Sequence, residues 1–195
     1  AKRAATSDAY PETGTTHFSI VDAEGNAVAV TSSIEQQFGN RTMVRGFLLN
    51  NQLTDFALYP QEAGAPVANR AAGGKRPRSS MAPTFVFDRD GRLVLVAGSP
   101  GGQMIINYVA KTLLAVLEWG YAPQAALDLP NFGSRNGPTE IEAGAAGDAL
   151  AAGLAELGHE VRRGVLTSGV HLIVRTRDGW IGAADPRREG LPVGE

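Results

Sequence analysis

The chain has 195 residues, 43% of them hydrophobic, and a net charge of −2 at pH 7, which is typical of one globular domain with a substantial core. With a nearly neutral charge, the chain has no large excess of basic residues of the kind that nucleic-acid-binding proteins carry. No apolar run is long enough to span a membrane. The absence of cysteine excludes thiol nucleophiles, disulfides and cysteine-ligated zinc. No signal peptide is visible, and the opening residues (AKR) resemble the middle of a longer protein, so the compartment stays open.

The first half of the chain predicts a hairpin followed by loops. Residues 1–14 are polar, small and interrupted by proline and glycine, as in a linker. Residues 16–21 and 27–33 alternate in polarity around a glycine turn, which predicts an antiparallel hairpin. Residues 46–50 predict a short buried strand, and residues 60–77 predict a loop without apolar periodicity.

The second half alternates hairpins with helices. An apolar-periodic run predicts a helix over residues 105–119, which Gly120 ends. The remaining predicted elements are hairpins 84–87/93–97 and 170–176/180–184 and helices 123–129 and 146–157. Hairpins separated by helices favour antiparallel sheets covered by helices, an α+β class.

The most informative segment is residues 14–22 (GTTHFSIVD), where a glycine precedes two threonines at the start of a strand. A break of the bond between Gly14 and Thr15 would make Thr15 a new amino terminus. Its hydroxyl and its own α-amine would then form a nucleophile and a general base within one residue. Such an amine has an ordinary pKa of about 7.7–8.0 and is a competent base near neutral pH.

The predicted hairpin brings Ser33 opposite Thr15, where the two hydroxyls can form a hydrogen bond across the strand pair. The alternative interpretation is that hydroxyl side chains simply suit a half-exposed strand.

Two polar segments follow. Residues 49–56 (LNNQLTDF) hold amides and a carboxylate, which suit either an α-ammonium ligand or an Asx-rich turn that caps a helix. Residues 75–81 (KRPRSSM) combine cations with paired serines, which suit either a substrate carboxylate or a solvated basic loop.

Residues 98–102 (GSPGG) stand between a predicted strand and a predicted helix, so their N–H groups can stabilise an oxyanion. An ordinary strand-to-helix turn is the alternative, and the ending of a P-loop is missing. His17, His159 and His171 lack metal-ligand spacing with acidic partners, so they are expected to be structural, and no metal or cofactor is predicted. Residues 185–187 (DPR) are expected to form a turn with a salt bridge.

In this order, the segments resemble the small, catalytic subunit of the γ-glutamyltranspeptidase (glutathione hydrolase) family, from about Gly14 to the carboxyl end. The resemblance implies the amino-terminal-nucleophile (Ntn) hydrolase fold, an αββα sandwich of antiparallel sheets between helical layers. It implies that residues 1–14 end the large subunit and residues 15–195 form the small subunit, with autocatalytic cleavage between Gly14 and Thr15. The large subunit of the same precursor is the expected partner.

The resemblance also implies roles for individual residues. Thr15 matches the nucleophile, Ser33 its supporting hydroxyl, and Gly101 and Gly102 the oxyanion hole. The implied substrate-binding residues are Glu35, Gln52, Asp55, Ser79 and Ser80. The first three correspond to positions for the α-amino group of a glutamyl moiety, and the two serines to positions for its α-carboxylate. The implied reaction is acyl transfer through a γ-glutamyl-threonine ester to water or an amine.

Glu35 departs from the asparagine of well-known members, and it can pair with the α-ammonium or favour a different acyl group. Three hypotheses follow: a γ-glutamyl hydrolase/transpeptidase acting on amides such as glutathione, a related acylase of glutaryl or cephalosporin-type amides, and an unprocessed non-catalytic homologue. With the Gly14–Thr15 bond intact the nitrogen of Thr15 is an amide, so the uncut chain is expected to be inactive.

Overall fold

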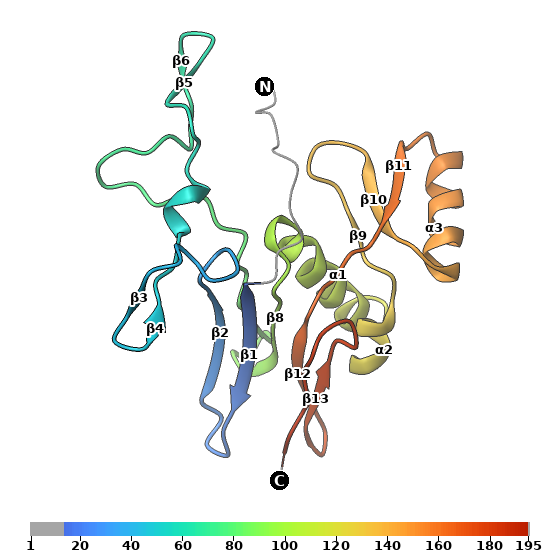
Figure 1. The fold of residues 1–195 in the computed structure, drawn as a ribbon. Helices are drawn as coiled ribbons and strands as arrows, with labels where there is room; N and C mark the ends of the chain where they lie inside the picture. Colours follow the sequence, from blue (N-terminus) through green and yellow to red (C-terminus); the bar gives the residue numbers. More distant parts are fainter. Residues whose placement is uncertain (1–13, 195) are drawn as a thin grey trace.

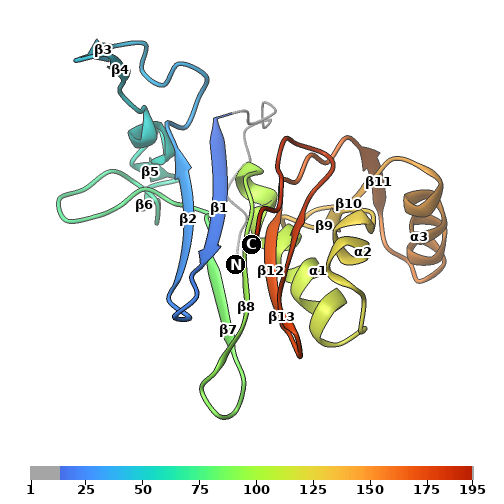
Figure 2. The same ribbon diagram turned by 90° about the horizontal axis from the view of Figure 1, so that it is seen from below.

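The computed structural model describes residues 14–194. Two sheets and a layer of helices lie one behind the other (Figures 1 and 2). The first sheet is the hairpin of β1 (Thr15–Val21) and β2 (Ala27–Ser33). The second sheet has the order β13-β12-β8-β7. Its strands are β7 (Thr84–Phe87), β8 (Leu93–Gly98), β12 (His171–Thr176) and β13 (Gly179–Ala184). The helices α1 (Ile105–Leu117) and α2 (Pro123–Asp128) cover the side of this sheet opposite the hairpin (Figure 2).

The core forms between the second sheet and the helices. Leu95, Val96 and Ala97 of β8 are fully buried, because the hairpin covers one face of this strand and α1 the other. Helix α1 turns a helical stripe towards the sheet, since its buried positions recur at intervals of three and four residues. The buried positions of α1 are Ile105, Tyr108, Val109, Lys111, Thr112 and Ala115.

A small third sheet lies at the far end of the helical layer. It consists of β9 (Phe132–Gly133), β10 (Thr139–Glu142) and β11 (Val161–Gly164), and α3 (Ala145–Glu156) packs against it. The pair β10–β11 is parallel, because α3 is the crossover between the two strands. The sequence did not predict these three short strands.

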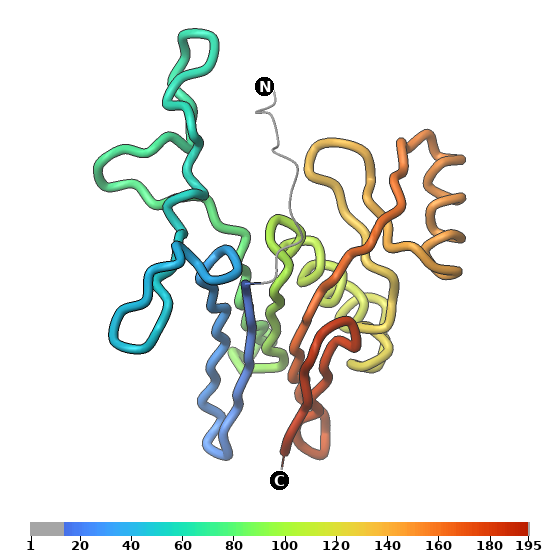
Figure 3. The backbone as a smooth tube through the Cα atoms, in the orientation of Figure 1, coloured from blue at the N-terminus to red at the C-terminus, as the bar shows by residue number. Residues whose placement is uncertain are grey.

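The chain between β2 and β7 leaves the two sheets and projects beyond them (Figure 3). It contains two short hairpins and a 3-10 turn. These elements are β3 (Met43–Val44), β4 (Phe47–Leu48), η1 (Gln52–Asp55), β5 (Gln61–Glu62) and β6 (Ala65–Pro66). The buried strand predicted over residues 46–50 is wrong: β3 and β4 form a small hairpin in which Met43 is 66% and Phe47 60% exposed.

The remaining predicted hairpins and helices are confirmed to within two residues at most ends. The antiparallel expectation holds for the hairpin sheet and the four-stranded sheet, and it is wrong for the β10–β11 pair. In the part of the chain that the structure describes, no helix combines the length and apolar character that a membrane crossing requires.

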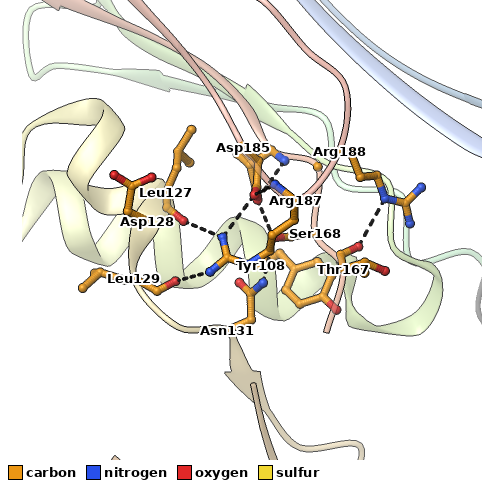
Figure 4. A network of polar contacts seen from close by, with 12 residues as sticks. Tyr108, Leu127, Asp128, Leu129, Asn131, Thr167, Ser168, Asp185, Arg187 and Arg188 are labelled. Atoms are coloured by element: carbon orange, nitrogen blue, oxygen red, sulfur yellow. Dashed lines mark hydrogen bonds and ion pairs between the residues drawn. The ribbon is translucent and has the colours of Figure 1, made fainter. Parts of the chain in front are cut away.

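A buried polar network ties the end of β13 to the helical layer (Figure 4). Asp185 is 2% exposed and pairs with Arg187 Nη1 at 3.1 Å, as the predicted turn with a salt bridge requires. Arg187 also donates to the carbonyls of Leu127 and Leu129 at 2.8 and 2.9 Å and to Glu142 at 2.7 Å. Asp185 accepts a hydrogen bond from the Ser168 hydroxyl. The network therefore holds the segment before β12 against the ends of α2 and β10.

The inner face of the hairpin is polar, with His17 at its centre. Its Nδ1 lies 2.8 Å from Thr31 Oγ1 and its Nε2 lies 3.0 Å from Ser19 Oγ, so both ring nitrogens have partners. A Cβ at position 98 would overlap the His17 ring, so the glycine lets β8 approach β1 closely. Burial, together with the neighbouring His171, lowers the pKa of His17 to about 4. His17 is therefore neutral at physiological pH, and it is structural as predicted.

Arg187→Met should destabilise the fold by about 3–5 kcal/mol, because it leaves the carboxylate of Asp185 buried without its cation. Arg162→Met is the matched control: Arg162 and Glu160 form a pair in which both side chains are about 70% exposed, and such pairs contribute at most about 1 kcal/mol. Urea unfolding of the two variants checks the difference, and equal losses would contradict the role given to the network.

His17 should make the fold acid-sensitive. Its pKa of about 4 in the folded protein lies below the ordinary value of 6.5, so the unfolded state binds more protons between these values. This contribution to stability is complete above about pH 6.5 and is lost as pH falls towards 4. His17→Gln should give a shallower decline of the melting temperature over this range, whereas the exposed His159→Gln should follow the wild type.

Candidate functional site

Thr15 begins β1 on its inner face, opposite Ser33 at the end of β2. Because side chains alternate along a strand, Thr15 points towards β8 with His17, and it is only 6% exposed. Its Oγ1 donates a hydrogen bond to Ser33 Oγ at 3.1 Å, as the sequence predicted. The cross-strand pair thus orients the hydroxyl of Thr15.

Gly14 precedes Thr15 in close contact with the segment after β2. A Cβ on residue 14 would lie 2.5 Å from the carbonyl oxygen of Glu35, so a larger residue does not fit without a shift of the backbone. The predicted cleavage bond therefore lies directly beside Glu35. The rest of the predicted segment 1–14 lies outside the described residues.

Glu35 occupies a strained backbone position next to the hydroxyl pair. Its φ of 74° lies in the left-handed region, which glutamate adopts rarely and asparagine more readily. Its N–H donates to Ser33 Oγ at 2.8 Å, so Ser33 contacts both Thr15 and Glu35. This contact fixes the start of the Glu35 side chain relative to the Thr15 hydroxyl.

Gln52 of η1 reaches the Glu35 carboxylate and also binds Asp55 at the other end of η1. Gln52 Nε2 donates to Asp55 Oδ2 at 2.6 Å and lies 3.3 Å from Glu35 Oε2. Two carboxylates therefore converge on one amide, and Asp55 is 19% exposed. An array of carboxylate oxygens and an amide is complementary to a cationic group that donates hydrogen bonds.

Asn51 holds η1 in this position. Its N–H donates to the carbonyl of Ile34 at 3.2 Å, and its Oδ1 accepts from the N–H of Gln36 at 3.0 Å. The backbone on both sides of Glu35 is thereby tied to the residue before Gln52. The sequence placed Asn51 among the amides but gave it no such role.

Ser79 and Ser80 lie in the segment that leads into β7. Ser79 is exposed and its Oγ accepts from the N–H of Met81 at 3.3 Å, while Ser80 is half-buried. Arg78 Nε lies 4.0 Å from Asp55 Oδ1, which brings this segment beside the Glu35–Gln52–Asp55 cluster. No hydrogen bond within the described residues joins either serine directly to the cluster or to Thr15.

Gly101 and Gly102 form the turn between β8 and α1. Gly101 has a φ of 134°, a region that L side chains rarely adopt, and a Cβ there would lie 2.5 Å from the ring of Tyr108. Within residues 14–194, neither glycine N–H donates a hydrogen bond to another group. Both donors remain for a ligand at the start of η2 (Gly102–Met104), which leads into α1.

Ser99 and Gly169 hold this turn through hydrogen bonds. Ser99 is fully buried, donates to the carbonyl of Pro100 at 2.6 Å and accepts from the N–H of Gly169 at 3.1 Å. Gly169 follows Ser168, which the Asp185 network holds. The sequence missed this support, because no local pattern indicates a contact between segments so far apart in the chain.

The structure thus joins Thr15 to Ser33, Ser33 to the backbone N–H of Glu35, and the Glu35 carboxylate through Gln52 to Asp55. No group of three or more histidine, aspartate or glutamate residues within 14–194 is arranged to hold a metal ion. The arrangement suits a hydroxyl nucleophile beside a cation-binding cluster.

Comparisons with family profiles, with related sequences and with solved structures all indicate the same family. A profile described as Gamma-glutamyltranspeptidase matches residues 1–194. The glutathione hydrolase proenzyme of Escherichia coli (strain K12) is 37% identical over 191 residues, which cover 91% of this chain and 32% of that protein. More generally, the chain spans 19% to 32% of the length of the bacterial proenzymes that it matches.

Solved structures agree with the sequence comparison. The γ-glutamyltranspeptidase of Pseudomonas nitroreducens in complex with L-DON matches with a TM-score of 0.79 and 30% identity, covering 92% of this chain and 99% of that one. Cephalosporin acylase from Bacillus halodurans matches with a TM-score of 0.77 and 25% identity, covering 90% of this chain and 33% of that one. The profile match and the relatives at 30% identity and above show that the chain belongs to the γ-glutamyltranspeptidase family and has its Ntn-hydrolase fold.

Proposed function

We propose that the protein is a γ-glutamyl hydrolase/transpeptidase that cleaves γ-glutamyl amides such as glutathione. Thr15 is the nucleophile, and the acyl group passes through a γ-glutamyl-threonine ester to water or to an amine. The observation that carries the proposal is the chain of contacts from the Thr15 hydroxyl through Ser33 to Glu35, Gln52 and Asp55. It joins a nucleophile to a cluster suited to an α-ammonium group.

The chemistry of each group supports this assignment. Ser33 accepts a hydrogen bond from Thr15 Oγ1 and so orients the oxygen that attacks. The α-amine of Thr15, once released from Gly14, takes the proton as the general base. The N–H groups of Gly101 and Gly102 stabilise the oxyanion that forms on the carbonyl oxygen. In the uncut chain the base is missing, so turnover requires cleavage first.

The division at Thr15 has independent support from the relatives. The chain covers 99% of the matched chain of the Pseudomonas nitroreducens enzyme but only 32% of the Escherichia coli proenzyme. A separate chain of that size is consistent with cleavage before a residue equivalent to Thr15. Residues 1–14 then form the end of a large subunit, and residues 15–195 the catalytic small subunit.

The proposed partner is the large subunit of the same precursor. The outer face of the hairpin carries Phe18, Ile20 and Val28, which are 43% to 53% exposed. Within the described residues, no helix covers this face (Figure 2). The αββα architecture has a helical layer in this position, and the proposed partner supplies it.

A second candidate is an acylase of glutaryl or cephalosporin-type amides, which the match to cephalosporin acylase favours. A glutaryl group has no α-amine, so it would offer no cation to the carboxylates of Glu35 and Asp55. The convergence of two carboxylates on Gln52 therefore supports the γ-glutamyl group over the glutaryl group. A non-catalytic homologue would have no need to keep the contacts that join the Thr15 hydroxyl to this cluster, so these contacts also favour an enzyme.

Thr15→Ala should abolish both cleavage of the precursor and release of p-nitroaniline from γ-glutamyl-p-nitroanilide, because it removes the only proposed nucleophile. Thr16→Ala is the matched control, since Thr16 lies next in β1 but faces outwards and is exposed. Intact-mass measurement follows the cleavage, and absorbance follows the turnover. Activity that survives in Thr15→Ala would contradict the mechanism.

Glu35→Gln should raise KM for γ-glutamyl-p-nitroanilide by about 10- to 100-fold, because a hydrogen bond to a charged group contributes about 1.5–3 kcal/mol. Turnover of glutaryl-p-nitroanilide should not fall, since this substrate lacks the ammonium group. Glu24→Gln in the exposed hairpin turn should leave both substrates unaffected. A wild-type preference for the glutaryl anilide would instead support the acylase.

A further inference from the structure

Gln103 directly follows the oxyanion glycines, and the proposed mechanism assigns it no task. It is the central residue of η2, and it is half-buried. Its Oε1 accepts a hydrogen bond from Arg135 Nη1 at 3.1 Å. Arg135 lies in the loop between β9 and β10, so two separate parts of the fold meet at this side chain.

An ion pair fixes the Arg135 guanidinium. Its Nε and Nη2 donate to Glu140 Oε1 at 3.2 and 2.6 Å. Both side chains are about 30% exposed, at 27% and 30%, so solvent screens the pair only in part. Glu140 is itself held in β10, which pairs with both β9 and β11. Arg135 is therefore a fixed donor rather than a mobile surface cation.

This contact determines the orientation of the Gln103 amide. The two ends of a glutamine amide are nearly equal in shape, but a guanidinium only donates hydrogen bonds. The amide oxygen must therefore face Arg135, and Nε2 with its two N–H donors must face the other way. Within residues 14–194, Nε2 of Gln103 donates to no other group. The contacts among Gln103, Arg135 and Glu140 thus orient the Nε2 donor of Gln103, which directly follows the proposed oxyanion glycines.

The position of this donor indicates which part of a substrate it meets. η1, which carries Gln52 and Asp55, lies on the side of β2, whereas the β9–β10 loop, which carries Arg135, lies on the side of the helices, with the turn before α1 between them (Figures 1 and 2). In acyl transfer the acyl chain and the amine extend in opposite directions from the reacting carbonyl. A donor on the side away from the acyl-binding cluster therefore meets the amine.

We propose that Gln103 Nε2 donates a hydrogen bond to the carbonyl or carboxylate oxygen that amino acids and peptides carry one carbon beyond the reacting nitrogen. The contact forms with the leaving peptide during acylation and with the acceptor during transfer. Arg135 and Glu140 are positioning residues that act through Gln103. This inference rests on the proposed function and adds a determinant of specificity for the amine side.

Water, and amines that lack a carbonyl group, cannot accept this hydrogen bond from Gln103 Nε2 at the same position. Gln103 should therefore influence the choice between transfer and hydrolysis without influencing formation of the acyl-enzyme from an anilide. This selectivity separates the proposed role from a general structural role, because a distorted turn at Gly101 and Gly102 would slow all these reactions together.

The test uses Gln103→Glu in the matured enzyme. This variant keeps the shape and the contact with Arg135, but it replaces the donor with a second acceptor. KM for glycylglycine as acceptor should rise by at least about fivefold, since a neutral hydrogen bond contributes about 1 kcal/mol. KM for ethylamine, and the rate of γ-glutamyl-p-nitroanilide hydrolysis without acceptor, should stay within about twofold of the wild type. Gln61→Glu, on the exposed strand β5, controls for the added charge.

Arg135→Gln provides a second measurement, because it frees the Gln103 amide to rotate. It should raise KM for glycylglycine by a smaller factor than Gln103→Glu, and the double variant should be no worse than Gln103→Glu alone. If Gln103→Glu does not mature, Gln103→Ala replaces it with the same expected selectivity.

An unchanged KM for glycylglycine in the Gln103 variant would overturn the inference, as would equal rises for glycylglycine and ethylamine. Both results leave γ-glutamyl hydrolysis by the wild type intact, so the proposed function survives them. A wild-type enzyme that releases no p-nitroaniline contradicts the proposed function itself, and with it the role of Gln103.

Discussion

The register of β1 against β2 is the constraint on which the site depends. Pairing Thr15 with Ser33 places their side chains on the face that packs against the second sheet, and it aligns the two hydroxyls for a hydrogen bond. A slip of one residue would turn Thr15 to the outside and bring Thr16 inside. His17 opposes such a slip, because its ring fits between Thr31, Ser19 and the glycine that ends β8. The proposed nucleophile is thus oriented by a strand pair and not by a loop.

The second sheet contributes the other half of the site through its connection to α1. The turn at Gly101 and Gly102 is supported by Tyr108 and by the hydrogen bond between Ser99 and Gly169. The segment of Gly169 is in turn held by the buried carboxylate of Asp185 through Ser168. The burial of this carboxylate, which costs free energy, is tolerated because Arg187, the Ser168 hydroxyl and the N–H of Val170 donate hydrogen bonds to it. The turn at residues 185–187 therefore helps to support the turn at Gly101 and Gly102, although the two lie far apart in the sequence.

The sequence predicted what depends on local periodicity and on cross-strand alternation. The hairpins and α1 follow from such patterns, and the Thr15–Ser33 contact follows from counting residues on either side of the Gly25 turn. The paths of loops were not predictable in this way. The approach of η1 to Glu35 depends on Asn51 binding the backbone of Ile34 and Gln36, and the orientation of Gln103 depends on Arg135 in a sheet whose strands are too short to recognise. Both are long-range contacts with no signal in the neighbouring residues.

Glu35 shows how backbone and side chain can favour different residues at one position. Its left-handed backbone favours asparagine, the residue that the family resemblance implies there, and a glutamate in this region costs about 1–3 kcal/mol. The strain is compensated locally, since the N–H of Glu35 binds Ser33 and its carboxylate meets Gln52. What glutamate adds is a second carboxylate beside that of Asp55, and both contact the amide of Gln52. The strained residue thus belongs to the proposed substrate-binding cluster, and the strain is localised at the contact with Ser33 that joins this cluster to Thr15.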